Sequence, residues 1–544
     1  MAASAEKLPR YSLALALALS GLLAGIYLIW QPQTTDLAAQ VFRADLWERA
    51  GFVIWNPDWY DGHSVPGYSL LYPPLGALLG PALVGAASAV AATWVFGRLA
   101  LDAWGQRAWL GVVWFGLASA VALYSGRITF ALGLALGLGA LLAIQRERAG
   151  WAAMLGFLAS AASPVAGLFV ALAGASVFLA SRFRLTRKPA AALPVRAAVA
   201  AAAGALLLIV LLAIAFPTSG YHPFGFASYL WIPLLAVAIL VFAGVREGPL
   251  LWGVLLYTLL GLAAVVIDTP LGGNVTRLGA TFAGPILAIL LLRRRPRVLV
   301  LLAIPLLIWQ WQTTVEDVSR AQADPSTEAA YFEPLLDELA LRSSRSAPLK
   351  VHVPPTRSRW EATYLAESYP ITRGWLRQEE SDDFRLFRDG PIEPEAYLEW
   401  LRDRGVTHVA LPDAEPDYLA RSERRLLRSA ASPVKLLWTG EHWRLYEVPG
   451  AAGAAEDEIL WLRPDGFTLM LADTSASIPL RFSPYFEVVG GAACIEPDPL
   501  SPRRTLITGT GVAASADQPI PITVEANLSL AAAAGRERQC STED

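Results

Sequence analysis

An acidic side chain closely follows the first apolar run of the chain. This run extends from Tyr11 to Trp30, and Asp36 ends the polar segment QPQTTD that comes next. A carboxylate at the boundary between an apolar phase and water can be partly desolvated and still reachable, which suits a general base. The alternative is an N-cap, in which Asp36 accepts hydrogen bonds from the free amides at the start of a helix. The residue type and its position allow both roles.

Two arginines stand at the start of later apolar runs. Arg127 ends the segment YSGR, and Arg277 ends the segment GGNVTR. A guanidinium group donates hydrogen bonds in a fork that matches a phosphate group, so we expect Arg127, Arg277 and the nearby Asn274 to bind phosphate. The neighbouring glycines would let the head of a lipid approach the backbone closely. The alternatives are that the arginines extend to the membrane surface or that Arg277 pairs with Asp268.

A segment rich in turn-forming and aromatic residues, WNPDWYDGH, occupies positions 55–63. Carboxylates can hydrogen-bond the hydroxyls of a sugar, and aromatic rings can stack on its apolar faces. The candidates for binding a sugar or an acceptor are Asp58, Trp59, Tyr60, Asp61 and His63. The segment could equally form a solvated turn with an interfacial aromatic belt. His222, in PTSGYHPF, is a further candidate that could also be an ordinary loop residue.

The composition separates the chain into two parts. Of its 544 residues 54% are hydrophobic and 17% are charged, whereas soluble domains have about a quarter charged residues. Residues 1–312 contain 20 Lys and Arg and 10 Asp and Glu, and residues 313–544 contain the other 24 and 37. A basic, apolar part followed by an acidic part of ordinary composition predicts a membrane domain joined to a water-soluble domain.

Several classes of function lack their motifs. The five histidines are scattered, without an HExxH pair, and the two cysteines are too few for a thiolate metal cluster. There is no GxxxxGK[ST] segment, which argues against a nucleotide-driven pump, and no basic stripe that would bind nucleic acid. We expect no cofactor, although a divalent metal stays open.

The apolar runs predict a polytopic helical bundle of about eleven spans. They occupy residues 11–30, 78–98, 108–125, 128–144, 151–162, 164–181, 197–216, 226–244, 249–267, 278–293 and 297–312. Several are slightly short for a bilayer core of about 30 Å. We separate 151–162 from 164–181 because Pro164 removes a helix donor and clashes with the preceding turn.

The basic residues predict the orientation of these spans. With eleven spans and a cytoplasmic N-terminus, 16 of the 20 basic residues in 1–312 fall on the cytoplasmic side. This asymmetry follows the positive-inside rule. We therefore expect a multi-pass protein of the plasma membrane with residues 313–544 outside the cytoplasm. Cys494 and Cys540 both fall in that part and could form a disulfide there.

The expected domains are a transmembrane domain (1–312) with a long first outer loop (31–77), an α/β module (313–448), a linker (449–458) and a β-sandwich with a tail (459–544). In the first outer loop, residues 37–50 read as an amphipathic helix suited to the membrane interface. In the module we expect a polar helix, a strand, a helix, a strand and a hairpin at 314–345, 350–353, 393–404, 406–411 and 434–448, respectively.

This layout resembles the GT-C superfamily of glycosyltransferases. The shared features are one span after a short tail, a long first outer loop that opens with an acidic residue, and a bundle of about eleven spans with an exterior C-terminal domain. A more specific match joins WNPDWYDGH to LYPPL at 71–75 and SPVAGLF at 163–169. These motifs resemble a bacterial membrane family catalogued as pyruvoyl-tetrahydropterin-synthase-related, a label that describes a domain name and not an activity. The resemblance covers roughly residues 11–448.

The resemblance implies transfer of a sugar from a polyprenyl-phosphate donor to a glycan or glycolipid acceptor of the cell envelope, on the outer face of the membrane. Asp36 then takes the position of the catalytic carboxylate, and Arg127 and Arg277 are placed by topology to hold the lipid phosphate. The chain departs from GT-C patterns with two adjacent acids, because Thr35 and Leu37 flank Asp36. The rival interpretations are a transporter or flippase and a non-catalytic envelope scaffold.

Overall fold

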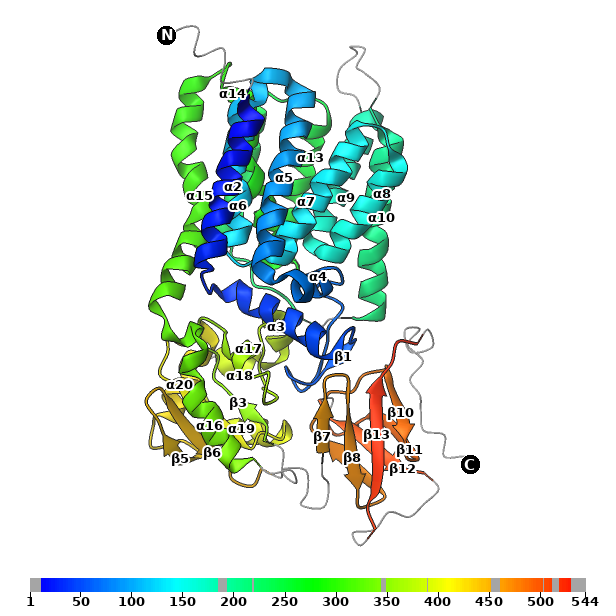
Figure 1. Cartoon of the computed structure of the whole chain (residues 1–544), viewed down its shortest axis with the longest axis vertical. Helices are drawn as coiled ribbons and strands as arrows, with labels where there is room; N and C mark the ends of the chain where they lie inside the picture. Colours follow the sequence, from blue (N-terminus) through cyan, green and yellow to red (C-terminus); the bar gives the residue numbers. More distant parts are fainter. Residues whose placement is uncertain are drawn as a thin grey trace. The chain divides into compact units, whose positions relative to one another are not determined.

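The computed structural model of this chain is mostly helical and divides into two compact units (Figure 1). It describes residues 11–183, 193–217, 220–343, 349–388, 390–451, 460–501, 503–510 and 518–529. Unit 1 comprises residues 1–40, 68–213 and 220–320, and unit 2 comprises residues 41–67, 214–219 and 321–544. The segment 41–67, which we expected within the membrane domain, therefore belongs with the C-terminal half of the chain.

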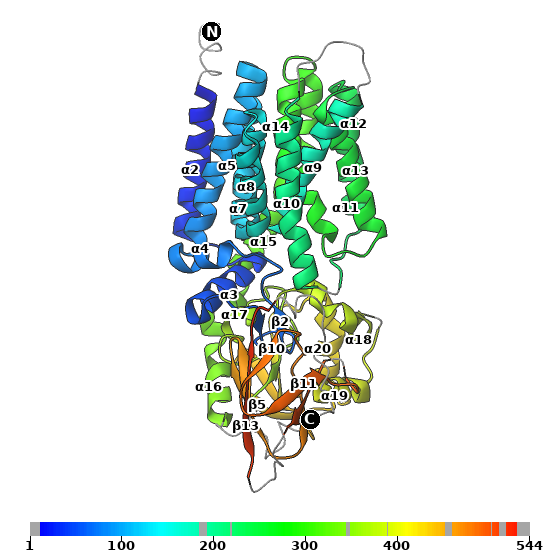
Figure 2. The same ribbon diagram turned by 90° about the vertical axis from the view of Figure 1, so that its right-hand side faces the viewer.

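Unit 1 is a bundle of helices that lie side by side (Figures 1 and 2). Its helices are α2 (Ser12–Trp30), the start of α3 (Thr35–Ala50), α4 (Tyr72–Leu79), α5 (Pro81–Trp104), α6 (Trp109–Tyr124), α7 (Ile128–Gln145), α8 (Ala149–Ala162), α9 (Pro164–Arg182), α10 (Val195–Ala215), α11 (Phe226–Tyr229), α12 (Trp231–Val237) with a π-helical turn (Ala238–Phe242), α13 (Pro249–Val266), α14 (Thr276–Leu291) and α15 (Pro296–Ala323).

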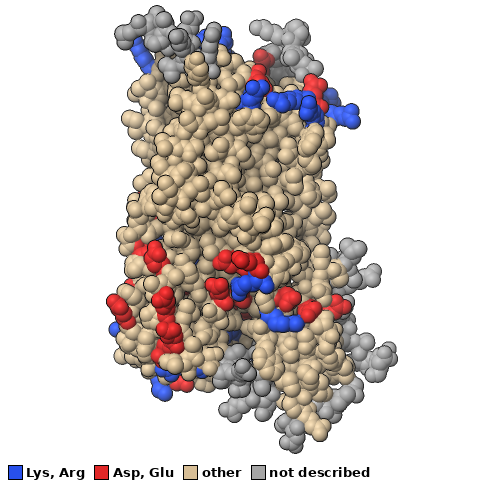
Figure 3. All heavy atoms as spheres, viewed as in Figure 1, with Lys and Arg blue, Asp and Glu red and all other residues tan. Residues whose placement is uncertain are grey.

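The composition of these helices suits a membrane. In the part of the chain that the structure describes, eight helical segments are long and apolar enough to cross a bilayer, and one of them, Pro81–Tyr124, contains both α5 and α6. Two shorter apolar helices occupy Ala149–Ala162 and Phe226–Phe242. The visible face of the bundle carries no charged side chain over its middle (Figure 3). All eleven predicted apolar runs fall on helices, while their number as spans stays a prediction.

The predicted break after residue 162 is confirmed. Helix α8 ends at Ala162, Ser163 is extended, and Pro164 occupies the first turn of α9. Proline fits at this position because the first turn has no internal partner for the missing amide hydrogen. The chain therefore forms two packed helices here instead of one long helix.

Two predicted helices differ in the structure. Helix α3 is buried along most of its length, including the polar side chains of Gln40 and Arg43, so it is not an amphipathic helix at a lipid surface. The polar helix expected at 314–345 is not a separate element. Helix α15 continues without a break through Ala323, because no proline or glycine interrupts it between Pro305 and that point. The chain then turns at Pro325 before the next helix begins.

Unit 2 contains the predicted α/β module with a four-stranded sheet in the order β3-β4-β6-β5. Strands β1 (Trp55–Asn56) and β2 (His63–Ser64) form a separate two-stranded sheet of unit 2. The helices and strands of the module are α16 (Glu333–Arg342), β3 (Val351–His352), α17 (Glu361–Tyr364), α18 (Phe384–Arg388), α19 (Pro394–Asp403), β4 (His408–Pro412), α20 (Arg421–Leu427), β5 (Lys435–Thr439) and β6 (Trp443–Glu447). Strands β3 and β4 are parallel, and the others are antiparallel. The hairpin expected at 434–448 is confirmed, with Lys435 opposite Glu447.

The C-terminal strands form the predicted β-sandwich. One sheet has the order β10-β13-β8-β7 and the other the order β11-β12-β9. The strands are β7 (Leu460–Arg463), β8 (Gly466–Leu471), β9 (Ser475–Ile478), β10 (Phe486–Gly490), β11 (Ala493–Pro497), β12 (Thr505–Gly509) and β13 (Ile520–Ala526). Alternate side chains such as Leu469, Ile507 and Ile522 fill one shared core. Cys494 lies on β11 and is disulfide-bonded, and Cys540 lies outside the described residues.

Candidate functional site

The turn between α6 and α7 holds Arg127 in a defined place. The amide of Gly126 donates to the carbonyl of Leu123, and the amide of Arg127 donates to the carbonyl of Ala122. These two bonds form a Schellman motif, in which the left-handed position belongs to Gly126, with a φ of +72°. Because α7 begins at the next residue, the backbone of Arg127 is held on both sides and its position is fixed.

Glycine also lets this turn approach the start of α3. A Cβ atom added at Gly126 would lie 2.5 Å from the amide nitrogen of Leu37 and 2.8 Å from the hydroxyl oxygen of Thr34. In the same way, a Cβ atom at Gly272 would overlap the carbonyl oxygen of His222. We expected this space to admit a lipid head, but other parts of the chain fill it. The glycines therefore serve close packing of the loops.

The approach brings Asp36 and Arg127 together across 91 residues of sequence. Nε of Arg127 donates to Oδ2 of Asp36 at 2.5 Å, and both side chains are only partly exposed. Asp36 lies in the first turn of α3, which begins at Thr35, so it is not the residue before the helix that an N-cap requires. Burial would raise the pKa of Asp36, but the charges of Arg127 and Arg277 outweigh it and hold this pKa below its usual value.

Arg277 joins this pair from the start of α14. Its guanidinium carbon lies 5.3 Å from the centre of the Phe130 ring, on α7. It forms no ion pair with Asp268 among the described residues, and Asp268 is exposed. We refer to Asp36, Arg127 and Arg277 as the Asp36 cluster. Its net charge is positive, because two guanidinium groups face one carboxylate.

The other two candidates of unit 1 lie beside this cluster. Asn274 is half-buried in the short 3₁₀ turn that precedes α14. The amide of His222 donates to the carbonyl of Thr269 at 3.0 Å, which fixes the loop against the start of that turn. When protonated, His222 would lower the pKa of Asp36 further. The structure therefore brings all five predicted residues of unit 1 into one region.

Two polar residues of this region were missed by the sequence analysis. Tyr68 accepts a hydrogen bond from Nε2 of Gln40 at 2.9 Å, and Asp317 lies on the polar part of α15 beside Arg320. Both act electrostatically on Arg127. Asp317 is thus a second acid near Asp36, although it is remote in sequence. The sequence did contain a signal for Asp317, because this acid closely follows an apolar run, as Asp36 does.

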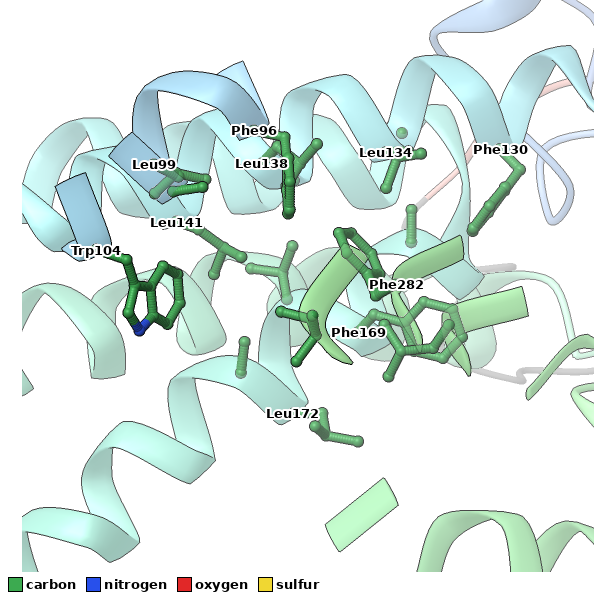
Figure 4. A pocket seen from close by; sticks show the side chains of 18 residues that line it. Phe96, Leu99, Trp104, Phe130, Leu134, Leu138, Leu141, Phe169, Leu172 and Phe282 are labelled. Atoms are coloured by element: carbon green, nitrogen blue, oxygen red, sulfur yellow. The ribbon is translucent and has the colours of Figure 1, made fainter. Parts of the chain in front are cut away.

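An apolar cavity of about 300 Å³ lies between α5, α7, α9 and α14 (Figure 4). Along α7 it extends from Phe130 to Leu141, which corresponds to ~16 Å at the helical rise of 1.5 Å per residue. Trp104 lies near the Leu141 end, and Phe130 and Leu278 line the other end. Because Arg277 stacks on Phe130 and precedes Leu278, this end of the cavity adjoins the Asp36 cluster.

The segment WNPDWYDGH occupies the interior of unit 2. The indole nitrogen of Trp59 donates to the carbonyl of Ala362 at 2.8 Å, and the hydroxyl of Tyr60 donates to the carbonyl of Leu376 at 2.7 Å. Both side chains are almost fully buried. They are therefore part of the core rather than open to a sugar, and they do not form an interfacial aromatic belt.

The polar residues of this segment are also used internally. Oδ1 of Asp61 pairs with Nζ of Lys350 at 2.7 Å, and Asp58 accepts a hydrogen bond from Asn56. Burial lowers the pKa of the His63 imidazole to about 3 and raises the pKa of Asp58 to about 6. His63 stacks on Trp59 with ring centres 5.2 Å apart. A neutral, buried imidazole of this kind packs as a ring and is not displayed to a ligand.

Unit 2 also contains a network of fully buried charges. Its members, which we call the buried charge network, are His352, Arg359, Arg373, Glu380, Asp417 and Glu423. Both oxygens of Glu380 are used, because Oε2 lies 3.0 Å from Nη2 of Arg373 and Oε1 lies 3.0 Å from Nη1 of Arg359. Glu423 accepts hydrogen bonds from His352 and from Tyr397. This network gave no sequence motif, because its members come from separate short elements.

Among the described residues, no group of three or more His, Cys, Asp and Glu side chains is placed to hold a metal ion. A scan against protein-family models finds no match to this chain, and a search of curated proteins also finds none.

Proposed function

We propose that this protein is a membrane glycosyltransferase that moves a sugar from a polyprenyl-phosphate donor to a glycan or glycolipid acceptor. The observation that carries the proposal is the convergence of Asp36, Arg127 and Arg277 beside one end of an apolar cavity. An amphiphile with an anionic head and an apolar chain matches both parts of this arrangement. Two guanidinium groups suit its phosphate, and the cavity suits the first part of its chain.

The chemical step assigns one role to each part of the cluster. The hydroxyl oxygen of the acceptor attacks the anomeric carbon, the bond from that carbon to the phosphate oxygen breaks, and the hydroxyl proton passes to Asp36. The phosphate leaves with the bonding electrons, and Arg127 and Arg277 stabilise the charge that it gains. No nucleotide takes part, in keeping with the missing nucleotide motifs.

Through its ion pair with Arg127, the basicity of Asp36 would depend on whether the donor is bound. In the free protein Arg127 holds the pKa of Asp36 low, which makes the carboxylate a weak base. A donor phosphate that binds Arg127 competes with Asp36 for the guanidinium group. Once the pair loosens, the pKa of Asp36 rises and its capacity to accept a proton improves. Binding of the donor would thus prepare the base.

The central test is Asp36→Asn in protein reconstituted in lipid nanodiscs. Because an amide cannot accept the proton, we expect transfer to fall by about 10²–10⁴-fold while binding of a polyprenyl monophosphate survives. Arg127→Gln and Arg277→Gln should instead weaken that binding. The acceptor and sugar are identified from the glycans that a deletion strain lacks.

Asp102→Asn is the matched control for Asp36→Asn. Asp102 also pairs with arginines, Arg98 and Arg146, but it is well exposed and distant in sequence from the cluster. Its amide variant should keep full transfer. Normal transfer by a folded Asp36→Asn protein would remove Asp36 from the mechanism. Movement of a lipid without transfer would support the flippase alternative, and neither activity in the wild type would support a scaffold.

The orientation in the plasma membrane belongs to the same proposal, with the N-terminus in the cytoplasm and residues 313–544 outside. It rests on the charge asymmetry and on the apolar helices of unit 1. In a cysteine-free background, Gln106→Cys should resist an impermeant thiol reagent applied to intact cells, and Glu441→Cys should react. The reverse pattern would contradict the orientation.

A further inference from the structure

A group of four arginines lies along one side of the short helix α20 in unit 2, three of them within the helix and the fourth, Arg428, at its C-terminal cap. Arg421, Arg424, Arg425 and Arg428 have the spacing i, i+3, i+4 and i+7, which places their side chains on one face of a helix. They line a hollow of about 670 Å³ together with Pro416 and Ser429. We call this surface the α20 arginine face.

Acidic groups are few around this face, where Asp413 is the only described carboxylate whose charge acts on Arg424. None of the four forms an ion pair within the described part of the chain. The nearest acids along the sequence are used elsewhere, because Glu423 is fully buried on His352, Asp413 binds Tyr331 and His442, and Glu415 binds Arg357. Like charges at these spacings repel one another, although the C-terminal end of a helix, where Arg424, Arg425 and Arg428 lie, favours cations.

Hydrogen bonds within the protein hold the side chains of Arg424 and Arg425 in place. The guanidinium group of Arg424 donates to the carbonyl oxygens of Ala414, at 2.5 Å, and Asp413, at 2.9 Å. Nη2 of Arg425 donates to the hydroxyl of Ser422 at 3.0 Å. These bonds use only some of the donors of each guanidinium group and reduce the entropy that binding would cost. Burial and the neighbouring charge of Arg428 also lower the pKa of Arg424.

We propose that the α20 arginine face binds a flexible polyanion, a polymer with phosphate or carboxylate groups along its chain. A hollow with several guanidinium groups at helical spacing can contact successive charges of such a polymer. The surrounding half of the chain has 37 acidic residues against 24 basic ones, so the face is a local exception to its acidic setting. The face belongs to unit 2 and the Asp36 cluster to unit 1, and this proposal does not depend on the proposed transferase activity.

A soluble polymer fits this face better than an anionic membrane surface. Interfacial helices insert an apolar face into the lipid, but Leu426 and Leu427 of α20 are buried in the core of the α/β module. The helix has only seven residues and no apolar face to insert. The membrane alternative is therefore an outcome that the test must recognise, not the favoured one.

The test measures binding of fluorescent inorganic polyphosphate to the full chain in nanodiscs of neutral lipid. We expect saturable binding that weakens with salt, because bound cations are released from the polymer. Arg425→Gln/Arg428→Gln should weaken it by about 5–30-fold, since an exposed charge pair contributes up to about fivefold. Glutamine preserves the helix propensity of arginine. Neutral dextran should not bind.

The matched control is Arg342→Gln/Arg463→Gln, which removes the same charge from two partly exposed arginines of unit 2 that already pair with Glu338 and Glu525. It should bind polyphosphate as the wild type does. Equal binding by the wild type and the α20 double variant would overturn the proposal. So would binding that occurs only to phosphatidylglycerol vesicles, which would assign the face to a membrane surface.

Discussion

The Asp36 cluster of unit 1 and the buried charge network of unit 2 use the same residue types in opposite surroundings. In the cluster, the side chains of Asp36 and Arg127 are 19% and 25% exposed, and two cations face one anion. In the network, Glu380, Arg359 and Arg373 are almost fully buried, and three acids face two arginines and one histidine. The network is closed to solvent, whereas the cluster is partly exposed, and the positive charge of its three members is only partly offset by Asp317.

This difference distinguishes the structural role of the network from the role that we propose for the cluster. A buried carboxylate with every oxygen paired cannot exchange its partner without a large desolvation cost. A partly exposed ion pair contributes little free energy, so one of its ions can be exchanged for another at low cost. A phosphate could therefore replace Asp36 on Arg127, whereas nothing could enter between Glu380 and its arginines. Charge and residue type alone do not distinguish the two sites, but exposure and charge balance do.

The largest effect on stability is expected in the network. Glu380→Gln leaves Arg359 and Arg373 buried without their shared anion, which should lower the free energy of unfolding by about 3–5 kcal/mol. Asp36→Asn should change it by less than about 1 kcal/mol. Thermal unfolding of the detergent-solubilised protein, followed by tryptophan fluorescence, compares the two. Equal losses would show that the two clusters do not differ in the way described.

The acid dependence of unit 2 provides a second test, centred on His63. Burial lowers the pKa of His63 from 6.5 to about 3, so between these values the unfolded chain binds a proton that the folded chain does not. Stability is therefore complete above pH 6.5 and falls with decreasing pH, by up to about 1.4 kcal/mol per pH unit. Relative to wild type, His63→Gln should lose less stability on acidification.

Three carboxyl groups of unit 2 oppose this trend. Burial raises the pKa values of Asp58 and Asp45 to about 6 and that of Glu361 to about 7, so the folded state binds their protons first and gains stability as the pH falls through these values. The comparison of His63→Gln with wild type at each pH cancels these contributions. Parallel pH curves for the two proteins would contradict a neutral, buried His63.

A smaller effect is expected from the turn that positions the Asp36 cluster. Gly126→Ala adds a Cβ atom in left-handed backbone against Leu37, which should cost about 1–3 kcal/mol and weaken binding of polyprenyl monophosphate by displacing Arg127. The control is Gly139→Ala on α7, where the added atom would lie 3.4 Å from Leu155, an ordinary contact. Weakened binding in the control as well would point to general helix damage.

The smallest effect concerns the stability supplied by the Asp36–Arg127 pair. In a double-mutant cycle with Asp36→Asn and Arg127→Gln, the coupling in free energy of unfolding should be about 1 kcal/mol or less, because both groups are partly hydrated. Adding polyprenyl monophosphate should stabilise the wild type more than the Arg127→Gln protein. A coupling of several kcal/mol would instead place this pair with the buried network.

Local signals in the sequence were sufficient for most elements. Apolar runs located the helices of unit 1, Pro164 located the break between α8 and α9, and alternation located the hairpin and the sandwich. Asp36, Arg127 and Arg277 could also be selected, because each is a charged residue beside an apolar run. These features depend on residues close in sequence, so the chain reveals them without its fold.

The tertiary structure alone decided which of these residues meet and which are buried. Contacts between helices that are distant in sequence pair Asp36 with Arg127 and place Asp317 near them. Such contacts also form the cavity beside Phe130. The segment WNPDWYDGH has the same composition whether it is solvated or buried. Only the packing of unit 2 removes it from solvent, because burial is a property of all the surrounding chain and leaves no periodic signal in nine residues.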